Sequence, residues 1–420
     1  MHLPHSPAIA SITEPGPASM PASTPSSSTD LAALPSRQGP AGPLTGVRVL
    51  DLSAYIAGPY GCTLLADQGA EVIKIEPPAG DNLRKYPSTL ETESRAFLGV
   101  NRSKLGAVLD LKQDEDRQRL QALARTADVL VHNFRPGVPE RLGIAYPTLA
   151  AEHPRLIYCA ITGYGDSGPL KDKAGYDQVL QAMTGMCAMQ AKRDGPPEIL
   201  YGSVVDYYAS TLVAAGVASA LFERERSGLG QYLGVSLLRA ALAMQSARLV
   251  WAASEGREVG RDMRSGGITG IHPTREGHIY ISANTPHFWQ ALCEKTGLAA
   301  LLCERYDSVR KRAALRDEIL PLLRAALARR SALEWEALFG DTVPCAAVRS
   351  VEDMFDFPQV REQGLIHDFE HPVAGPYRGF TAPIAFSRTP GPAPFAAPAL
   401  DQHGADIRAA ADRLRESGND

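Results

Sequence analysis

The first half of the chain alternates short apolar runs rich in β-branched residues with longer segments whose apolar positions recur every three or four residues. The runs at 47–52, 71–76, 128–133 and 156–161 predict strands, and the segments around 62–66 and 116–127 predict helices between them. Such alternation is typical of a parallel sheet with helices on both faces. We therefore expect an α/β fold whose large, Rossmann-like domain covers 44–255.

The pattern changes in the second half, where a strand-like alternation at 277–282 precedes helical periodicity at 288–296, 312–329 and 333–339. This order of elements predicts a smaller α+β domain, which we place at 270–350. The remaining segment, 358–420, is expected to rejoin the large domain.

Residues 1–43 form an extension dominated by Pro, Ser, Thr, Ala and Gly, with no apolar period. Such a segment buries too little apolar surface to offset the entropy lost on ordering, so we expect it to be disordered. It also lacks the compact apolar core of a secretory signal peptide.

Composition narrows the class of partner. The 420 residues are 44% hydrophobic and carry a net charge of −4, which gives no basic footprint for nucleic acid. No run approaches the ~20 apolar residues of a membrane span. The six cysteines are scattered without metal-ligand spacing, which favours a reducing compartment and no metal site. We expect a cytoplasmic protein that acts on a small molecule.

The first strand-helix-strand unit invites comparison with dinucleotide-binding folds, because Glu76 ends its second strand where a ribose-binding acid would stand. Its first turn, 57–61, reads AGPYG instead of G-x-G-x-x-G, and Pro59 removes a backbone donor from the pyrophosphate position. The sequence therefore argues against a nicotinamide or flavin enzyme.

Asp206 is the leading candidate for a chemical role, because it opens the long apolar run 207–216. At a helix N-terminus, unpaired N–H groups and the helix dipole would keep its carboxylate ionised and available as a nucleophile. The alternative is an ordinary helix cap, since Asp is a preferred residue there.

A series of motifs decides between these readings. In order, the chain carries LDL with AGP (50–59), VIKIEPP (72–78), NRSK (101–104) with LDLK (109–112), NFRPG (133–137), RLG (141–143), TGYGDSGP (162–169) and GYD (175–177). Together they closely resemble the class III CoA-transferases, the CaiB/BaiF family, from about Leu44 to the C-terminus.

The resemblance implies an enzyme that uses coenzyme A esters as substrates and holds no permanent cofactor. It implies that Asp206 attacks an acyl thioester to form a mixed anhydride, that the released thiolate then forms an aspartyl-CoA thioester, and that an incoming carboxylate takes the CoA. It also implies an interlocked homodimer.

The resemblance further assigns site residues. The positions that match the family's CoA-binding segments are Ile56, Ala57, Leu109, Lys112, Asn133, Phe134, Arg135, Arg141, Tyr176 and Asp177. Lys112, Arg135 and Arg141 would meet phosphates. Gly266 and Gly267 lie in a glycine loop whose N–H groups could stabilise an oxyanion, or which could be a plain interdomain turn.

Two other functions stay open. The α-methylacyl-CoA racemases share most of these motifs, but they carry a histidine where Tyr176 stands and a glutamate where Thr285 stands. Phenols and hydroxyls titrate far from neutrality, so a racemase would lack its acid/base pair here. A non-catalytic acyl-CoA binding protein is the second alternative, although it would have no need of Asp206.

Overall fold

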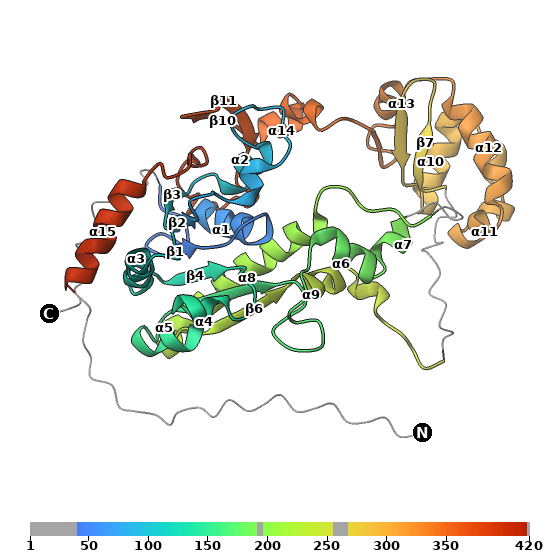
Figure 1. Cartoon of the computed structure of the whole chain (residues 1–420). Helices are drawn as coiled ribbons and strands as arrows, with labels where there is room; N and C mark the ends of the chain where they lie inside the picture. Colours follow the sequence, from blue (N-terminus) through green and yellow to red (C-terminus); the bar gives the residue numbers. More distant parts are fainter. Residues whose placement is uncertain (1–39, 191–195, 255–267, 418–420) are drawn as a thin grey trace.

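The computed structural model describes residues 40–190, 196–254 and 268–417. The predicted extension, 1–43, lies outside these ranges except for 40–43. Gly266 and Gly267, in the expected oxyanion loop, lie wholly outside them. The large domain is built on a six-stranded parallel sheet in the order β3-β2-β1-β4-β5-β6 (Figure 1). Its strands are β1 (Arg48–Asp51), β2 (Glu71–Glu76), β3 (Leu105–Val108), β4 (Val129–His132), β5 (Ile157–Thr162) and β6 (Tyr232–Ser236).

Helices cover both faces of this sheet, which confirms the predicted fold class. Those of the large domain are α1 (Ala57–Asp67), α2 (Arg95–Asn101), α3 (Asp114–Ala124), α4 (Val138–Leu142), α5 (Tyr146–Glu152), α6 (Asp177–Met183), α7 (Met186–Gln190), α8 (Val204–Ser227) and α9 (Leu237–Ala243). The strand order places a switch point between β1 and β4, where ligands of α/β folds usually bind.

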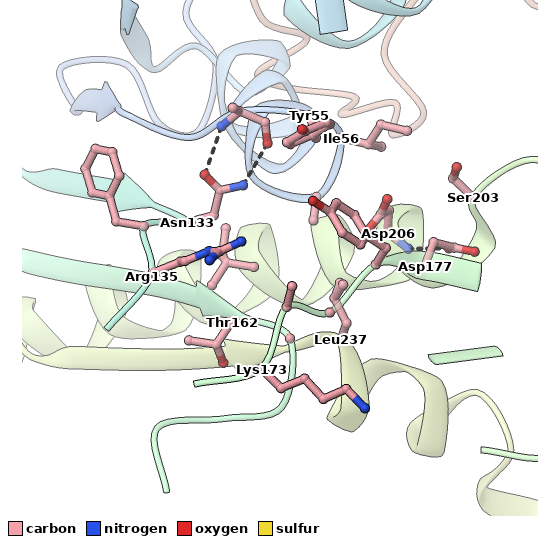
Figure 2. A pocket seen from close by; sticks show the side chains of 18 of the residues that line it. Tyr55, Ile56, Asn133, Arg135, Thr162, Lys173, Asp177, Ser203, Asp206 and Leu237 are labelled. Carbon is pink, nitrogen blue, oxygen red and sulfur yellow. Dashed lines mark hydrogen bonds between the residues drawn. The ribbon is translucent and has the colours of Figure 1, made fainter. Parts of the chain in front are cut away.

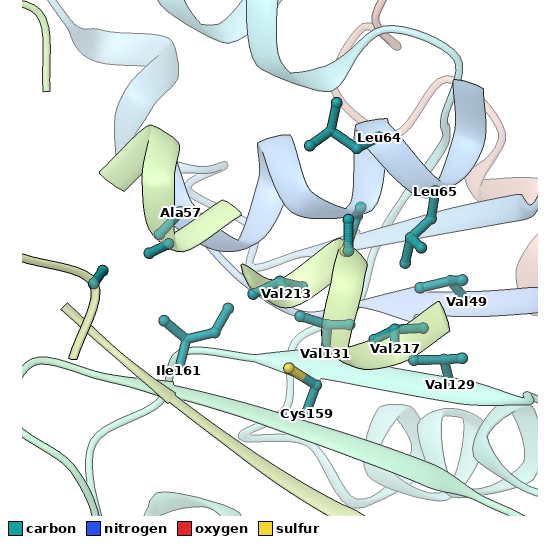
Figure 3. Close-up of a cluster of buried hydrophobic side chains, with 14 of the residues drawn as sticks. Val49, Ala57, Leu64, Leu65, Val129, Val131, Cys159, Ile161, Val213 and Val217 are labelled. Carbon is teal, nitrogen blue, oxygen red and sulfur yellow. The ribbon is translucent and has the colours of Figure 1, made fainter. Parts of the chain in front are cut away.

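Two apolar cores, one on each face, explain why Val, Ile and Leu residues stand next to one another along the central strands. Val49 and Val131 point into the core formed with α1 and α8, which Figure 3 shows. Leu50 and Leu130, their neighbours along β1 and β4, point into the opposite core. Gly61 lets α1 and α8 approach closely, because a Cβ there would lie 2.9 Å from Val213.

Helix α8 is long and apolar enough to cross a membrane by length and composition, alone among the helices of the described residues. The expectation that no run approaches that length is therefore corrected. In the structure α8 packs along α1 and against β5 and β6. Near its end, the buried Arg224 pairs with Asp128 at 2.8 Å. The small buried side chains of α8, among them Ala209, Ser210 and Ala214, allow this close packing.

Residues 270–347 form a separate unit beside the large domain (Figure 1). It contains an antiparallel sheet of β7 (Gly270–Pro273), β8 (His278–Ile281) and β9 (Cys345–Ala347), with α10 (Pro286–Thr296), α11 (Val309–Ala314), α12 (Arg316–Leu327) and α13 (Ala332–Phe339). Trp289, Trp335 and Phe339 contribute to its own core.

The chain then returns to the large domain through α14 (Pro358–Glu362), the hairpin of β10 (Ile366–His371) and β11 (Gly375–Phe380), and α15 (Gly404–Ser417). Helix α15 packs on α3 and β3. Before α15, the chain crosses β3 so closely that a Cβ at Gly106 would lie 2.8 Å from Pro398.

Candidate functional site

A cavity of about 270 Å³ opens at the carboxyl ends of β1, β4 and β5, beside the start of α8. Most of the predicted site residues line it: Ile56, Ala57, Asn133, Phe134, Arg135, Tyr176, Asp177 and Asp206 (Figure 2). They come from the loops after β1 and β4, from the segment that enters α6, and from the first turn of α8. Its position matches the switch point set by the strand order.

Three predicted CoA-binding residues are not part of this cavity. Leu109 is buried in an apolar core, so its side chain is not available to a ligand there. Lys112 and Arg141 are exposed on the surface, Lys112 in the turn after β3 and Arg141 on α4. Gly266 and Gly267 lie outside the described residues, and their expected oxyanion role stays a prediction.

Asp206 lies in the first turn of α8, with its side chain in the cavity (Figure 2). Burial and the neighbouring carboxylate of Asp177 raise the pKa of Asp206 to about 7. The expectation that the helix N–H groups hold it ionised is therefore wrong. Those of Val205 and Asp206 donate to Asp177 Oδ2, at 2.6 and 3.0 Å.

Asn133 serves the site through the backbone of the first loop. Its side-chain oxygen accepts a hydrogen bond from the N–H of Ala54 at 3.0 Å, and its amide donates to the carbonyl of Ala54 at 2.8 Å. One donor and one acceptor are thus committed to the loop, as the dashed lines in Figure 2 show. Asn133 therefore connects the loops after β1 and β4. Fewer of its hydrogen-bonding groups remain for the direct contact with CoA that the sequence predicted.

A buried network of ion pairs contacts the loop after β1. Lys74 donates to the carbonyl of Ser53 at 2.9 Å and pairs with Asp81 at 3.0 Å. Lys104 pairs with Asp51 at 2.8 Å, and both side chains are fully buried. Burial opposes ionisation of Asp51, but the two lysines outweigh it and lower the pKa of this carboxyl. Through Lys74, the network ties the carbonyl of Ser53 to β2.

Tyrosines close one side of the cavity. Tyr55 packs edge-on against Tyr86 and Tyr176, with ring centroids 6.3 and 6.1 Å apart. Tyr55 has a φ of 66°, which is strained for a residue with a side chain. Its N–H donates to Asp81 at 3.1 Å, which helps to hold that conformation. Sequence reasoning missed Tyr55 and Tyr86, because neither lies in a residue pattern that has a chemical meaning on its own.

Cations gather on the opposite side. Arg135, Lys171 and Lys173 line the cavity and are exposed. Within the described residues, none of the three forms a salt bridge within 4 Å, so each can meet an anionic ligand such as a phosphate. Lys171 and Lys173 were missed from the sequence, where they read as ordinary surface charges.

Other candidate chemistry is not assembled around this cavity. Thr285, the position of the racemase glutamate, is the residue before α10 in the small domain and does not line the cavity. Among the described residues, no group of three His, Cys, Asp or Glu side chains is arranged to hold a metal ion. Asp177 is the carboxylate whose charge acts on Asp206.

Comparison with known proteins places this arrangement in a family. The model of CoA-transferase family III matches residues 44–404, so the chain belongs to that family. It is 36% identical over 341 residues to the acetyl-CoA:oxalate CoA-transferase of Acetobacter aceti, covering 78% of this chain and 86% of that protein.

Two further relatives span more of the chain. The succinate–glutarate CoA-transferase of Agrobacterium fabrum is 31% identical over 385 residues, covering 87% of this chain and 95% of that protein. The crystal structure of a CaiB/BaiF family protein from Brucella suis superimposes with a TM-score of 0.77 at 28% identity, covering 89% of this chain and 100% of the other. The predicted resemblance is confirmed, and the protein is an enzyme of the CoA-transferase class.

Proposed function

We propose that the enzyme moves CoA from an acyl-CoA donor to a carboxylic acid acceptor through covalent intermediates on Asp206. The observation that carries this proposal is the position of Asp206: a carboxylate with a pKa of about 7, facing a cavity that is also lined by cations suited to phosphates. Such a carboxylate is partly ionised at neutral pH and is more basic than an ordinary aspartate, which favours attack on a thioester.

The reaction needs no external oxidant, reductant or net proton. A carboxylate oxygen of Asp206 bonds to the thioester carbonyl carbon, the C–S bond breaks, and CoA leaves as its thiolate. The thiolate attacks the Asp206 acyl carbon of the mixed anhydride and releases the donor acid as a carboxylate. The acceptor carboxylate then attacks the acyl carbon of the aspartyl-CoA thioester, which expels the CoA thiolate and forms a second mixed anhydride. The thiolate attacks the acceptor acyl carbon of this anhydride, which forms the new acyl-CoA and releases the Asp206 carboxylate.

Each intermediate must be kept from water, because hydrolysis would destroy its activation. Tyr55, Tyr86 and Tyr176 place apolar ring surface beside Asp206. Arg135 and Lys173 provide charge for the pyrophosphate of CoA on the other side. The loop held by Asn133 at Ala54 carries Tyr55 and so fixes the tyrosine side of the cavity.

The acids exchanged are the next question. The two CoA-transferases compared above are named for acetyl-CoA and oxalate and for succinate and glutarate, so the acceptor in each name is a dicarboxylic acid. A dicarboxylate acceptor is therefore the first class to assay, with succinyl-CoA and acetyl-CoA as donors.

The proposed functional unit is a homodimer in the cytoplasm. Tyr201, Val250 and Trp251 are 97%, 73% and 59% exposed in the single chain, and a second copy that covered them would remove this apolar surface from water. All six cysteines are free thiols, which suits a reducing compartment.

Steady-state exchange assays with Asp206→Asn test the proposal. The variant should lose CoA transfer while keeping acyl-CoA affinity, measured by calorimetry. Asp341→Asn, which changes an exposed carboxylate in the turn after α13, is the matched control and should keep wild-type rates. Transfer that persists in Asp206→Asn would refute the proposal, and α-proton exchange of a 2-methylacyl-CoA would favour a racemase instead.

A further inference from the structure

Asp177 is almost completely buried, with 2% of its surface exposed, at the start of α6. Both of its carboxylate oxygens are in use. Oδ2 accepts the backbone N–H groups of Val205 and Asp206, at 2.6 and 3.0 Å, and Oδ1 accepts from the side chain of Gln181 at 2.5 Å. A carboxylate engaged in this way faces the protein more than a ligand, so its expected part in CoA binding is not the role that its contacts favour.

Gln181 extends the contact to the chain before α8. It is fully buried, its amide donates to the carbonyl of Leu200 at 3.0 Å, and its oxygen accepts the N–H of Leu200 at 2.9 Å. Between Leu200 and α8 the backbone turns sharply, with φ of 100° at Gly202 and 54° at Ser203. The left-handed conformation of Ser203 is strained, so the surrounding contacts must hold it in place. Asp177 and Gln181 clamp both ends of this turn.

The clamp determines what surrounds the nucleophile. Within the described residues, no hydrogen bond to the Asp206 carboxylate is found, and two N–H groups at the helix start, those of Val205 and Asp206, donate to Asp177 instead. Hydrogen bonds to a carboxylate stabilise its charge and weaken it as a nucleophile. A carboxylate without them keeps its electron pairs for the thioester carbon.

We propose that Asp177 is a positioning residue for the transfer reaction: it caps the first turn of α8 and so keeps the Asp206 carboxylate free of helix hydrogen bonds and directed into the cavity. This inference rests on the proposed nucleophilic role of Asp206. It reassigns Asp177 from ligand binding to control of the nucleophile.

The charge of Asp177 acts in the same direction. The titratable groups that interact with Asp206 are Asp177 from α6, Tyr86 from the loop after β2, and Tyr207 on α8. Burial raises the pKa of both phenols, so they stay neutral near pH 7, while Arg135 and Lys173 line the far side of the cavity. Asp177 is thus the neighbour that places negative charge beside Asp206.

The test compares pH profiles of kcat/KM for the full-length enzyme and three variants. Asp177→Asn and Asp177→Ser both remove the charge, and the shorter serine also withdraws the acceptor from the helix N–H groups, so the acid limb should move about one unit to lower pH and kcat at pH 8 should fall about tenfold or more. The KM for acyl-CoA should change less than twofold. The serine variant also avoids the donor-to-donor contact that asparagine would make with Gln181.

Gln181→Ala is the uncharged control. It loosens the turn without removing the Asp177 carboxylate, so kcat should fall while the acid limb stays in place. An unmoved limb in both Asp177 variants, a raised KM with unchanged kcat, or full activity in Gln181→Ala would each overturn the inference. CoA transfer by Asp206→Asn is measured in the same experiment. Transfer that survives without Asp206 would refute the proposed function itself, as distinct from the role inferred for Asp177.

Discussion

Replacing Asp206 with asparagine should stabilise the protein above neutral pH even though it removes the nucleophile. The ordinary pKa of an aspartate, 3.8, is raised to about 7 at this position by burial and by Asp177. The unfolded chain therefore releases the Asp206 proton more easily than the folded chain does. The folded state loses stability from this carboxyl as pH rises from about 4 to about 7, and the full cost is present above pH 7.

The size of the effect follows from the shift. About three units correspond to about 4 kcal/mol, and solvent around this partly buried group reduces the expected gain to about 2 kcal/mol. A gain of that size raises Tm by about 4 to 8 °C in a domain of about 200 residues. Asparagine keeps the shape of the side chain and resembles its protonated form, so the comparison isolates the charge.

The assay is thermal unfolding of wild type and Asp206→Asn at pH 5, 6, 7 and 8, followed by circular dichroism. The two proteins should melt together at the lowest pH and separate progressively, with the variant more stable at pH 8. Asp341→Asn should show no such separation. A gap that does not change with pH, or a variant less stable at pH 8, would refute the reasoning about the environment of Asp206.

Three further variants probe the rest of the site. Asn133→Ala removes two hydrogen bonds to the backbone of Ala54, so it should cost about 2 kcal/mol of stability and raise the KM for acyl-CoA; an unchanged KM and Tm would show that the loop holds itself. Arg135→Met should raise the KM for acyl-CoA about tenfold with kcat preserved. In calorimetry the variant should also prefer CoA over pantetheine, which lacks phosphates, less strongly than wild type does; an unchanged KM would contradict the assignment. Lys104→Met leaves the buried Asp51 without its ion-pair partner and should lower the free energy of unfolding by about 3 to 5 kcal/mol, measured in urea. Wild-type stability in this variant would show that the network contributes little to the stability of the fold.

The sequence predicted the sheet best where Val, Ile and Leu are concentrated in a short run. β1, β2 and β4 lie within the expected runs and β5 ends one residue beyond its run, because each strand is buried on both faces. β3 was missed, since its small residues gain their burial from the C-terminal segment that crosses near Pro398, almost 300 residues away. β6 was missed too, because it is a partly exposed edge strand without a continuous apolar run.

The chemical properties of the site residues also depend on contacts between distant parts of the chain. Asp206 stood out from its place before an apolar run, but its raised pKa depends on burial in the folded chain and on Asp177, which lies 29 residues earlier in the sequence. No local pattern shows that this second carboxylate takes the helix N–H groups. The strained conformation of Tyr55 depends likewise on Asp81 and Asn133, which only the folded chain brings to one loop.

The most direct test of the account is trapping of the covalent intermediate. Wild type and Asp206→Asn would be incubated with succinyl-CoA, acetyl-CoA and longer acyl-CoAs, treated with hydroxylamine, and analysed by peptide mass spectrometry. We predict a hydroxamate on Asp206 of the wild-type enzyme with at least one donor and none in the variant. A wild-type enzyme that catalyses CoA transfer yet forms no adduct on Asp206 with its own donor would contradict the central claim.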